Sequence, residues 1–285
     1  MTQITQCDAT LGAVVRGISL KSPLGQADLD AIVQAWHQHA VLIFPGQHLS
    51  DDEQIAFTRY FGKLERGNRR SAKSGLSVLS NVQGDGVVAP PSSLQSRFLK
   101  GNTYWHTDSS YKRVGAKASL LGARTVPTTG GQTEFADMRA AWDALSDKDK
   151  AELDGKIAVH DYQFSHAPFG GLETLSVDEL AQLPPVKHPM VRVHPDTGRK
   201  NLFVGRHASH VVGDNFEASR QRLHDLTQWA CQPPRVLTHQ WEVGDLVIWD
   251  NRCVLHRGHS WPAEQARVMV RTTVAGDAPD NEWVL

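Results

Sequence analysis

The segment Trp105-His106-Thr107-Asp108 holds the first residues whose types and spacing could do chemistry. If this segment is a β-strand, the side chains of His106 and Asp108 point to the same face, because residues two apart share a face of a strand. An imidazole nitrogen beside a carboxylate oxygen supplies two ligands for a divalent metal ion. A histidine and an aspartate with this spacing also occur as ordinary polar residues on an exposed strand. A metal site therefore needs a third ligand from elsewhere in the chain.

His256 is the candidate for that third ligand, and it lies near the end of the run Gly244–Gly258. Two histidines and one carboxylate on one face of a metal ion leave three positions open, which is the ligand set of non-haem Fe(II) oxygenases. A structural zinc site would instead be closed by four protein ligands. Asp250 and Asn251 could orient His256 or simply form a turn. Packing of His256 at a strand end is the alternative to metal binding.

Arg267 and Arg271 follow in a segment where polar and apolar residues alternate, Arg267–Val274. On one face of a strand their Cα atoms would lie roughly 13 Å apart, four rises of about 3.3 Å. If that face lies inside a barrel, each guanidinium needs an anion, because a buried charge must be paired. Arginine binds carboxylates through two hydrogen bonds, which indicates two carboxylate-bearing small molecules. The alternative is a basic strand that faces solvent.

Taken together, these motifs resemble the taurine dioxygenase/TfdA family of Fe(II)- and 2-oxoglutarate-dependent dioxygenases. The resemblance covers nearly the whole chain. It rests on Trp105–Asp108, Gly130–Phe135, Trp249–His256, Arg267 with Arg271, Gly12–Ile18, Phe44–Gln47 and Phe61-Gly62. Within the family, the chain is similar to the branch that degrades aryloxyalkanoates, through Phe135–Ala141, Gly205–His210 and Trp249–Gly258.

The resemblance implies a role for each residue of the metal and cosubstrate site. His106, Asp108 and His256 would bind Fe(II). The cosubstrate 2-oxoglutarate would chelate the iron, and its distal carboxylate would meet Arg267 and the hydroxyl of Thr133.

For the substrate, the resemblance implies that Asn102 lines the site and that Arg271 holds a carboxylate or sulfonate. Five further basic or histidine residues are candidates for the substrate pocket without an assigned role. They are Arg69, Arg70, Lys73, His207 and His210. For the two histidines, the alternative is packing beside the barrel.

The implied reaction uses O₂ to hydroxylate a small anionic substrate next to its anionic group, with release of succinate and CO₂. The substrate would be an aryloxyalkanoate-like carboxylate or a sulfonate. The same ligands could also support desaturation, or halogenation, which is disfavoured because Asp108 fills the position that a halide needs. Two different functions also fit these residues, namely a zinc- or manganese-dependent hydrolase with an activated water and a non-catalytic barrel that binds an organic acid.

Short strands with Gly and Pro turns around several helices predict a mainly β fold with helices on its flanks. The family resemblance implies a double-stranded β-helix, a distorted jelly roll of the cupin-like kind. We expect a single domain over residues 1–285. Strands are predicted at 41–44, 77–82, 254–256 and 267–274, and a hairpin from 236–241 and 246–249.

Helices are predicted where apolar residues recur at helical spacing or where a capping box opens the segment. The predicted ranges are 29–36, 50–62, 137–145, 146–153, 176–183 and 215–231. Residues 84–101 are predicted to be a long active-site loop, because Pro90-Pro91-Ser92-Ser93 cannot be helical.

The composition of the chain limits which kinds of binding partner are expected. The 30 basic and 31 acidic residues give a net charge of −1, so neither nucleic acid nor an anionic membrane is an expected partner. No apolar run approaches the roughly 20 residues of a membrane helix, and no signal peptide is recognised, so we expect a cytoplasmic protein. Three scattered cysteines exclude a disulfide framework. A small anionic molecule is the expected partner, and we expect a homo-oligomer.

Overall fold

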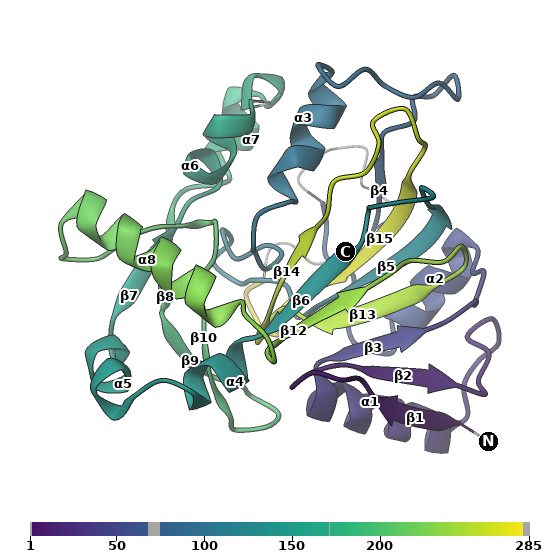
Figure 1. Cartoon of the computed structure of the whole chain (residues 1–285), viewed down its shortest axis with the longest axis horizontal. Helices are drawn as coiled ribbons and strands as arrows, with labels where there is room; N and C mark the ends of the chain where they lie inside the picture. The colour runs from purple at the N-terminus through teal and green to yellow at the C-terminus, as the bar shows by residue number, and fades with distance from the viewer. Residues whose placement is uncertain (1, 68–74, 171, 282–285) are drawn as a thin grey trace.

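The computed structural model describes residues 2–67, 75–170 and 172–281, so Arg69, Arg70 and Lys73 lie outside the described residues. Two β-sheets form the centre of the molecule (Figure 1). The larger sheet has the strand order β1 (Gln3–Gln6), β2 (Ala13–Arg16), β3 (Val41–Phe44), β13 (Leu246–Asp250), β5 (Ala118–Thr125), β15 (Val268–Val274) and β4 (Leu76–Ser80). The smaller sheet has the order β12 (Val236–His239), β6 (Thr133–Asp137) and β14 (Val254–Gly258).

Apolar side chains from both sheets pack against each other in one core cluster. Phe135 of the smaller sheet and Trp249 and Met269 of the larger sheet belong to it, and all three are buried. Their strands belong to a series that changes sheet repeatedly along the chain, since β5, β13 and β15 lie in the larger sheet and β6, β12 and β14 in the smaller one. The predicted mainly β fold with flanking helices is confirmed.

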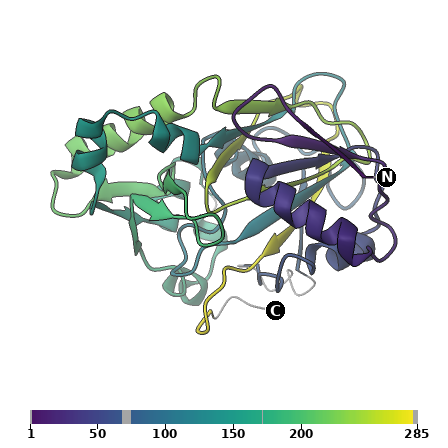
Figure 2. The same ribbon diagram turned by 90° about the horizontal axis from the view of Figure 1, so that it is seen from below.

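Helices α1 (Gln26–His39) and α2 (Asp51–Thr58) cover the outer face of the larger sheet (Figure 2). Ser50 and Glu53 form the predicted capping box at the start of α2. The predicted end of this helix at Gly62 is wrong. After Thr58 the chain turns more tightly, with hydrogen bonds three residues apart that end at Phe61.

A second lobe lies beside the sheets (Figure 1). Its strands are β11 (Ala208–Val211), β7 (Ile157–His160) and β8 (Val186–Pro189) in one sheet and β10 (Lys200–Leu202) with β9 (Val191–Val193) in another. Its helices are α4 (Met138–Asp143), α5 (Asp147–Leu153) and α8 (Phe216–Ala230). Leu223 of α8 and Met138 of α4 share a buried cluster with Leu255 of β14, which joins the lobe to the smaller sheet.

The predicted hairpin between residues 236–241 and 246–249 is wrong. Strand β12 pairs with β6, whereas β13 pairs with β3 and β5. The turn between β12 and β13 therefore carries the chain from one sheet to the other. Asp245 fixes this crossing, because its carboxylate accepts hydrogen bonds from the backbone N–H groups of Glu242 (3.0 Å) and Gly46 (3.1 Å).

Residues 84–101 are only partly a loop, because α3 (Leu94–Gly101) occupies the second half of the segment. The hydroxyl of Ser93 caps this helix by accepting a hydrogen bond from the Ser96 N–H at 3.1 Å. Pro90 and Pro91 exclude a helix only over themselves and their neighbours, so they mark its beginning and not a loop that continues to residue 101.

Several short helices lie near α3 at one end of the molecule (Figure 1). They are α6 (Tyr162–His166), η2 (Ala167–Phe169), η3 (Leu172–Thr174) and α7 (Val177–Ala181). Across residues 2–67, 75–170 and 172–281, no helix combines the length and the apolar character that crossing a membrane requires.

Candidate active site

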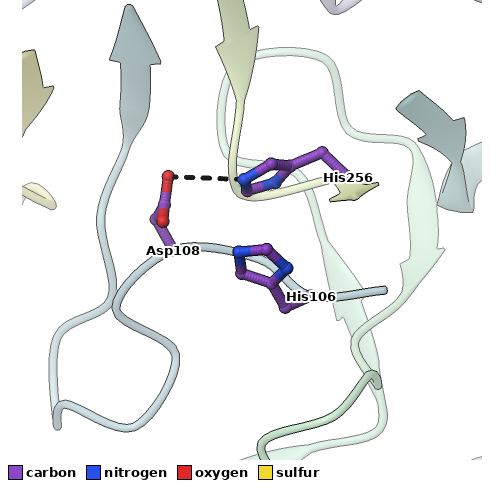
Figure 3. Close-up of side chains that lie close together, drawn as sticks. All are labelled: His106, Asp108 and His256. Carbon is purple, nitrogen blue, oxygen red and sulfur yellow. Dashed lines mark ion pairs between the residues drawn. The ribbon is translucent and has the colours of Figure 1, made fainter. Parts of the chain in front are cut away.

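His106, Asp108 and His256 converge at one buried point between the sheets (Figure 3). Their potential ligand atoms all lie within 4.8 Å of one another. The Nε2 atom of His256 is 3.8 Å from Oδ2 of Asp108. The three residues that the sequence singles out are therefore brought together, in an arrangement that one metal ion could bridge.

The route by which they converge differs from the prediction. His106 is not in a continuous strand but in a single antiparallel bridge with His256, with reciprocal backbone hydrogen bonds of 3.0 and 2.7 Å. Directly opposed residues in such a pair project their side chains to the same side. Asp108 reaches the same point from the turn that follows, in which Ser109 adopts a left-handed φ of 59°.

Both histidines are neutral, which is the form that binds a metal, and a hydrogen bond also fixes the tautomer of His106. The Nδ1 atom of His106 lies 2.7 Å from the Tyr104 carbonyl, so it carries the proton and leaves Nε2 with a free lone pair. Burial lowers the pKa of His106 well below its usual value, and burial lowers the pKa of His256 to about 4. Neutral imidazoles are the ligands that metal ions require.

Both carboxylate oxygens of Asp108 already accept hydrogen bonds. The Ser119 hydroxyl donates to Oδ2 at 2.7 Å, and Nη1 of Arg271 donates to Oδ1 at 2.7 Å. Burial raises the pKa of Asp108, but the charge of Arg271 and the neighbouring histidines outweigh burial, so the pKa lies well below its usual value. Asp108 is therefore a carboxylate, as a metal ligand must be.

Asn251 supports Asp108 and not His256. Its side-chain oxygen accepts hydrogen bonds from the Asp108 backbone N–H at 3.2 Å and from the Trp249 indole at 2.9 Å. Its amide nitrogen donates to Ser119 at 2.9 Å. Asp250 turns away from the site toward other partners. The orienting role at His256 that the sequence allows for these two residues is wrong.

A narrow pocket leads from the three residues to Arg267, and strands of both sheets supply about half of its lining. Its lining includes Leu79, Leu121, Thr133, Trp249, His256, Arg267 and Arg271. Arg267 is 7% exposed, and Nη2 donates to the Gly131 carbonyl at 3.2 Å. Its buried Nε has no partner, and among the described residues no carboxylate pairs with it. Burial lowers the pKa of Arg267 to about 10.

Thr133 and Asn102 also line the narrow pocket, as predicted from the resemblance. The Thr133 hydroxyl accepts a hydrogen bond from the Trp241 indole at 2.9 Å, so its own hydrogen is available to a ligand. Asn102 ends α3, and its carbonyl accepts a hydrogen bond from the Gly258 N–H at 2.8 Å.

A wide cavity of about 850 Å³ meets the narrow pocket at His106. Loops and short helices outside the sheets supply most of its walls. They include Gln83, Pro90, Leu94, Leu99, Tyr111, Tyr162, His166, Arg206 and His207. Asn102 and Arg271 line both spaces. The site therefore has one small compartment and one large compartment on either side of the three converging residues.

Arg271 has an anionic partner within the protein, because it is paired with Asp108. The expectation that it needs a ligand to balance its charge is therefore wrong, although its buried Nε has no partner among the described residues.

Arg206 is a site residue that the sequence does not reveal. It lines the wide cavity, its Nη2 lies 3.1 Å from Nε2 of His166, and its Nη1 donates to the Gly101 carbonyl. Within the described chain it pairs with no carboxylate, and its Nε is buried without a partner. In the sequence, the run Gly205–His210 carries a family likeness and no sign that Arg206 lines a cavity.

The two unassigned histidines of that run have different surroundings. His207 is buried, lines the wide cavity and lies 2.8 Å from the Ser165 hydroxyl. His210 does not line the cavity and packs against Phe216.

Comparison with known proteins agrees with this geometry. Residues 2–273 match the family model for the taurine catabolism dioxygenase TauD, TfdA family. A relative from Delftia acidovorans, an (S)-phenoxypropionate/alpha-ketoglutarate-dioxygenase, is 42% identical over 98% of this chain and 97% of its own. An alpha-ketoglutarate-dependent 2,4-dichlorophenoxyacetate dioxygenase from Cupriavidus pinatubonensis is 42% identical over 93% of this chain and 95% of its own.

Among solved structures, the crystal structure of AAD-2 in complex with Mn(II) and N-oxalylglycine has a TM-score of 0.90. It is 38% identical and covers 98% of each chain. The fold, the converging residues and these matches define a 2-oxoglutarate-dependent dioxygenase, which is the predicted class of enzyme. The chain belongs to the TauD/TfdA family.

Proposed function

We propose that the protein is an Fe(II)-dependent dioxygenase that hydroxylates an aryloxyalkanoate-like acid next to its anionic group. One observation carries the proposal. Two neutral histidines and one carboxylate converge where a narrow pocket with an unpaired buried arginine meets a wide cavity. The names of the phenoxypropionate and dichlorophenoxyacetate relatives support the aryloxy part of the substrate.

The donor set fits Fe(II). His106, Asp108 and His256 supply two nitrogens and one oxygen and leave three positions for ligands from outside the protein. When bound, the iron supplies the redox chemistry that couples O₂ reduction to decarboxylation of 2-oxoglutarate and to oxidation of a substrate C–H bond. The protein holds Asp108 in place through Ser119 and Arg271.

The narrow pocket fits 2-oxoglutarate. A carboxylate at its end would satisfy the unpaired Nε of Arg267 and accept the free hydrogen of the Thr133 hydroxyl. The other end of the diacid would then face the converging residues. We assign Arg267 and Thr133 to the distal carboxylate of the cosubstrate, and Asn102 to the wall between cosubstrate and substrate.

The wide cavity fits the substrate, and its volume of about 850 Å³ is within the usual range for small-molecule sites. Arg206 and Arg271 are the two arginines in its described lining. Because Arg206 has no carboxylate partner in the described chain, we assign the substrate's anionic group to it. Arg271 remains a second candidate through its unpaired Nε.

We further infer that the two sheets form a double-stranded β-helix. The support is the series of strands that changes between the larger and the smaller sheet, including the crossing from β12 to β13. In this arrangement the metal and cosubstrate residues lie inside the barrel that the two sheets enclose.

Succinate release from 2-oxoglutarate, with Fe(II) and O₂ present, tests the proposal on phenoxyacetate and on its uncharged amide. The acid should drive turnover at least ~100-fold better than the amide, since an unpaired buried charge costs a few kcal/mol. Asp108→Ala should abolish turnover while the far-ultraviolet circular dichroism is unchanged. Arg206→Leu should lose most of the preference for the acid, and Arg271→Leu tests the second candidate in the same way.

Turnover by Asp108→Ala at the wild-type rate would refute the metal site. If the preference for the acid survives Arg206→Leu and is lost in Arg271→Leu, the anion binds Arg271. If both variants keep the preference, the assignment of an anionic substrate to the wide cavity is wrong.

A further inference from the structure

A third cavity, of about 410 Å³, lies between α8 and the segment of α6 and η2. We call it the α8 cavity. Its walls include Tyr104, Trp105, Phe164, Phe169, Arg206, Arg220, His224, Gln228 and Arg257. None of the three residues that converge at the active site lines it, so it is a separate space.

The charged residues in the walls of the α8 cavity are cationic, and none of its described lining residues is Asp or Glu. Arg257 is neutralised by Glu134, whose Oε2 lies 2.6 Å from Nε. Among the described residues, the one carboxylate near Arg220 is that of Glu217 at 3.7 Å, and this exposed ion pair neutralises Arg220 weakly. Arg206 has no carboxylate partner in the described chain. The cavity therefore attracts an anion.

Each of these three arginines also lies over an aromatic ring of the same cavity. The guanidinium carbon is 5.3 Å from the ring centre of Phe164 for Arg220, 5.7 Å from that of Phe169 for Arg206, and 4.5 Å from that of Trp105 for Arg257. Planar guanidinium groups and aromatic rings together offer flat surfaces on which a further ring can stack.

We propose that the α8 cavity is a second binding site for an aromatic carboxylate, which adjoins the substrate site at Arg206. The ring would stack among Tyr104, Phe164 and Phe169, and the carboxylate would pair with Arg220 and Arg206. The volume suits a molecule of one or two rings. The ligand class is that of the proposed substrate, so this choice of class rests on the proposed function.

Two contacts connect the α8 cavity with the active site. Arg206 lines both the α8 cavity and the wide cavity. Tyr104, which is 54% exposed at the α8 cavity, holds Nδ1 of His106 through its carbonyl. A carboxylate that draws Arg206 toward the α8 cavity weakens its hold on a substrate anion. The second site therefore inhibits turnover when aromatic acid is abundant.

Isothermal titration of the metal-free protein with 1-naphthoate tests the second site. Arg220→Glu replaces an attractive charge with a repulsive one and should weaken one of the naphthoate sites about tenfold, which equals about 1.4 kcal/mol. The matched control is Arg222→Glu, on the same helix, because Arg222 pairs with Glu152 and does not line the cavity. Cyclohexanecarboxylate, which lacks an aromatic ring, should bind the Arg220-dependent site at least about fivefold more weakly.

Dependence on Arg220 separates this inference from the proposed function. If the wide cavity takes no aromatic acid, naphthoate still binds at the Arg220-dependent site, and only the proposed substrate is wrong. Equal affinities for wild type, Arg220→Glu and Arg222→Glu would overturn the inference. In turnover assays, naphthoate should raise the KM for phenoxyacetate more in wild type and in Arg222→Glu than in Arg220→Glu, because competition in the wide cavity does not depend on Arg220.

Discussion

Arg267 shows most clearly what a single residue contributes to the site. Its guanidinium is buried at the end of the narrow pocket and pairs with no carboxylate of the described chain. Arg267→Ala should raise the KM for 2-oxoglutarate much more than the KM for the substrate. Loss of a charged bond to a buried carboxylate costs about 2–5 kcal/mol. Steady-state kinetics with each ligand varied in turn measures both values.

Arg192→Ala is the control for this variant. Arg192 lies over the ring of Phe203 in the second lobe and lines neither the narrow pocket nor the wide cavity. Its removal should leave both KM values unchanged. An equal rise of both KM values in Arg267→Ala would contradict the assignment of Arg267 to the cosubstrate.

The sequence is informative about residues whose type alone limits their chemistry. His106, Asp108 and His256 can be proposed as ligands because imidazole and carboxylate bind metals, and the structure brings them together. The pairing of Arg271 with Asp108 cannot be foreseen, because it depends on the distance between residues 163 positions apart.

At the level of elements, the turn between β13 and β14 positions Asp108, a proposed metal ligand that belongs to neither strand. Asn251 in this turn holds the backbone of Asp108 and the Ser119 hydroxyl. Asn251→Ala should lower the affinity for Mn(II) about 10–100-fold, as loss of a residue that orients a metal ligand typically does. Calorimetric titration of the protein with Mn(II) measures this change.

Asn215→Ala is the control for Asn251→Ala, because it should lower the stability of the protein at a place away from Asp108. Asn215 caps α8 by accepting a hydrogen bond from the Ala218 N–H at 3.1 Å, so its loss costs about 1 kcal/mol of stability. It should not alter Mn(II) affinity. If both variants weaken Mn(II) binding equally, Asn251 acts only on stability and does not position Asp108.

Elements specified by local contacts agree with their sequence signals. The capping boxes at Ser50 and Ser176 are present because each needs only residues three positions apart. The predicted hairpin from β12 to β13 fails because a turn signal does not specify which strand will be the partner. Helix α3 is not predicted because the prolines before it dominate the pattern of the whole segment.

At the level of the whole molecule, a buried ionic network joins the end of β13 to two distant parts of the chain. Asp250 accepts hydrogen bonds from Arg252 and lies 2.9 Å from His194 of the second lobe. Arg252 also forms an ion pair with Asp196. Oδ2 of Asp196 lies 3.4 Å from Nε2 of His37 in α1. The sheet, the second lobe and the outer helix are thus tied together at one place.

This network gives stability that depends on pH. Burial raises the pKa of Asp250, but hydrogen bonds from Arg252 and His194 outweigh burial and lower the pKa to about 2. The ordinary pKa of Asp is about 3.9, so the contribution is complete above pH ~4 and is lost as the pH falls toward about 2. Asp250→Asn should lower the free energy of unfolding at pH 7 by about 3–5 kcal/mol.

Urea denaturation at about pH 7 and at several values between about pH 4 and pH 2 measures this effect. The difference between wild type and Asp250→Asn should shrink as the pH falls. The exposed pair of Asp143 with Arg199 is the comparison, and Asp143→Asn should cost less than about 1 kcal/mol at any pH. A constant difference between wild type and Asp250→Asn across this range would show that the carboxylate charge is not responsible.

The two compartments of the active site have walls of different origin, and this has a consequence for how the enzyme can diversify. Strands of both sheets supply about half of the lining of the narrow pocket, whereas loops and short helices such as α3 and α6 build most of the wide cavity. Mutations in the loops can reshape one compartment without disturbing the hydrogen-bonded ladder behind the other. Related enzymes can therefore acquire new substrates by gradual mutation of the loops around the wide cavity. The narrow pocket, and with it the requirement for 2-oxoglutarate, would stay unchanged.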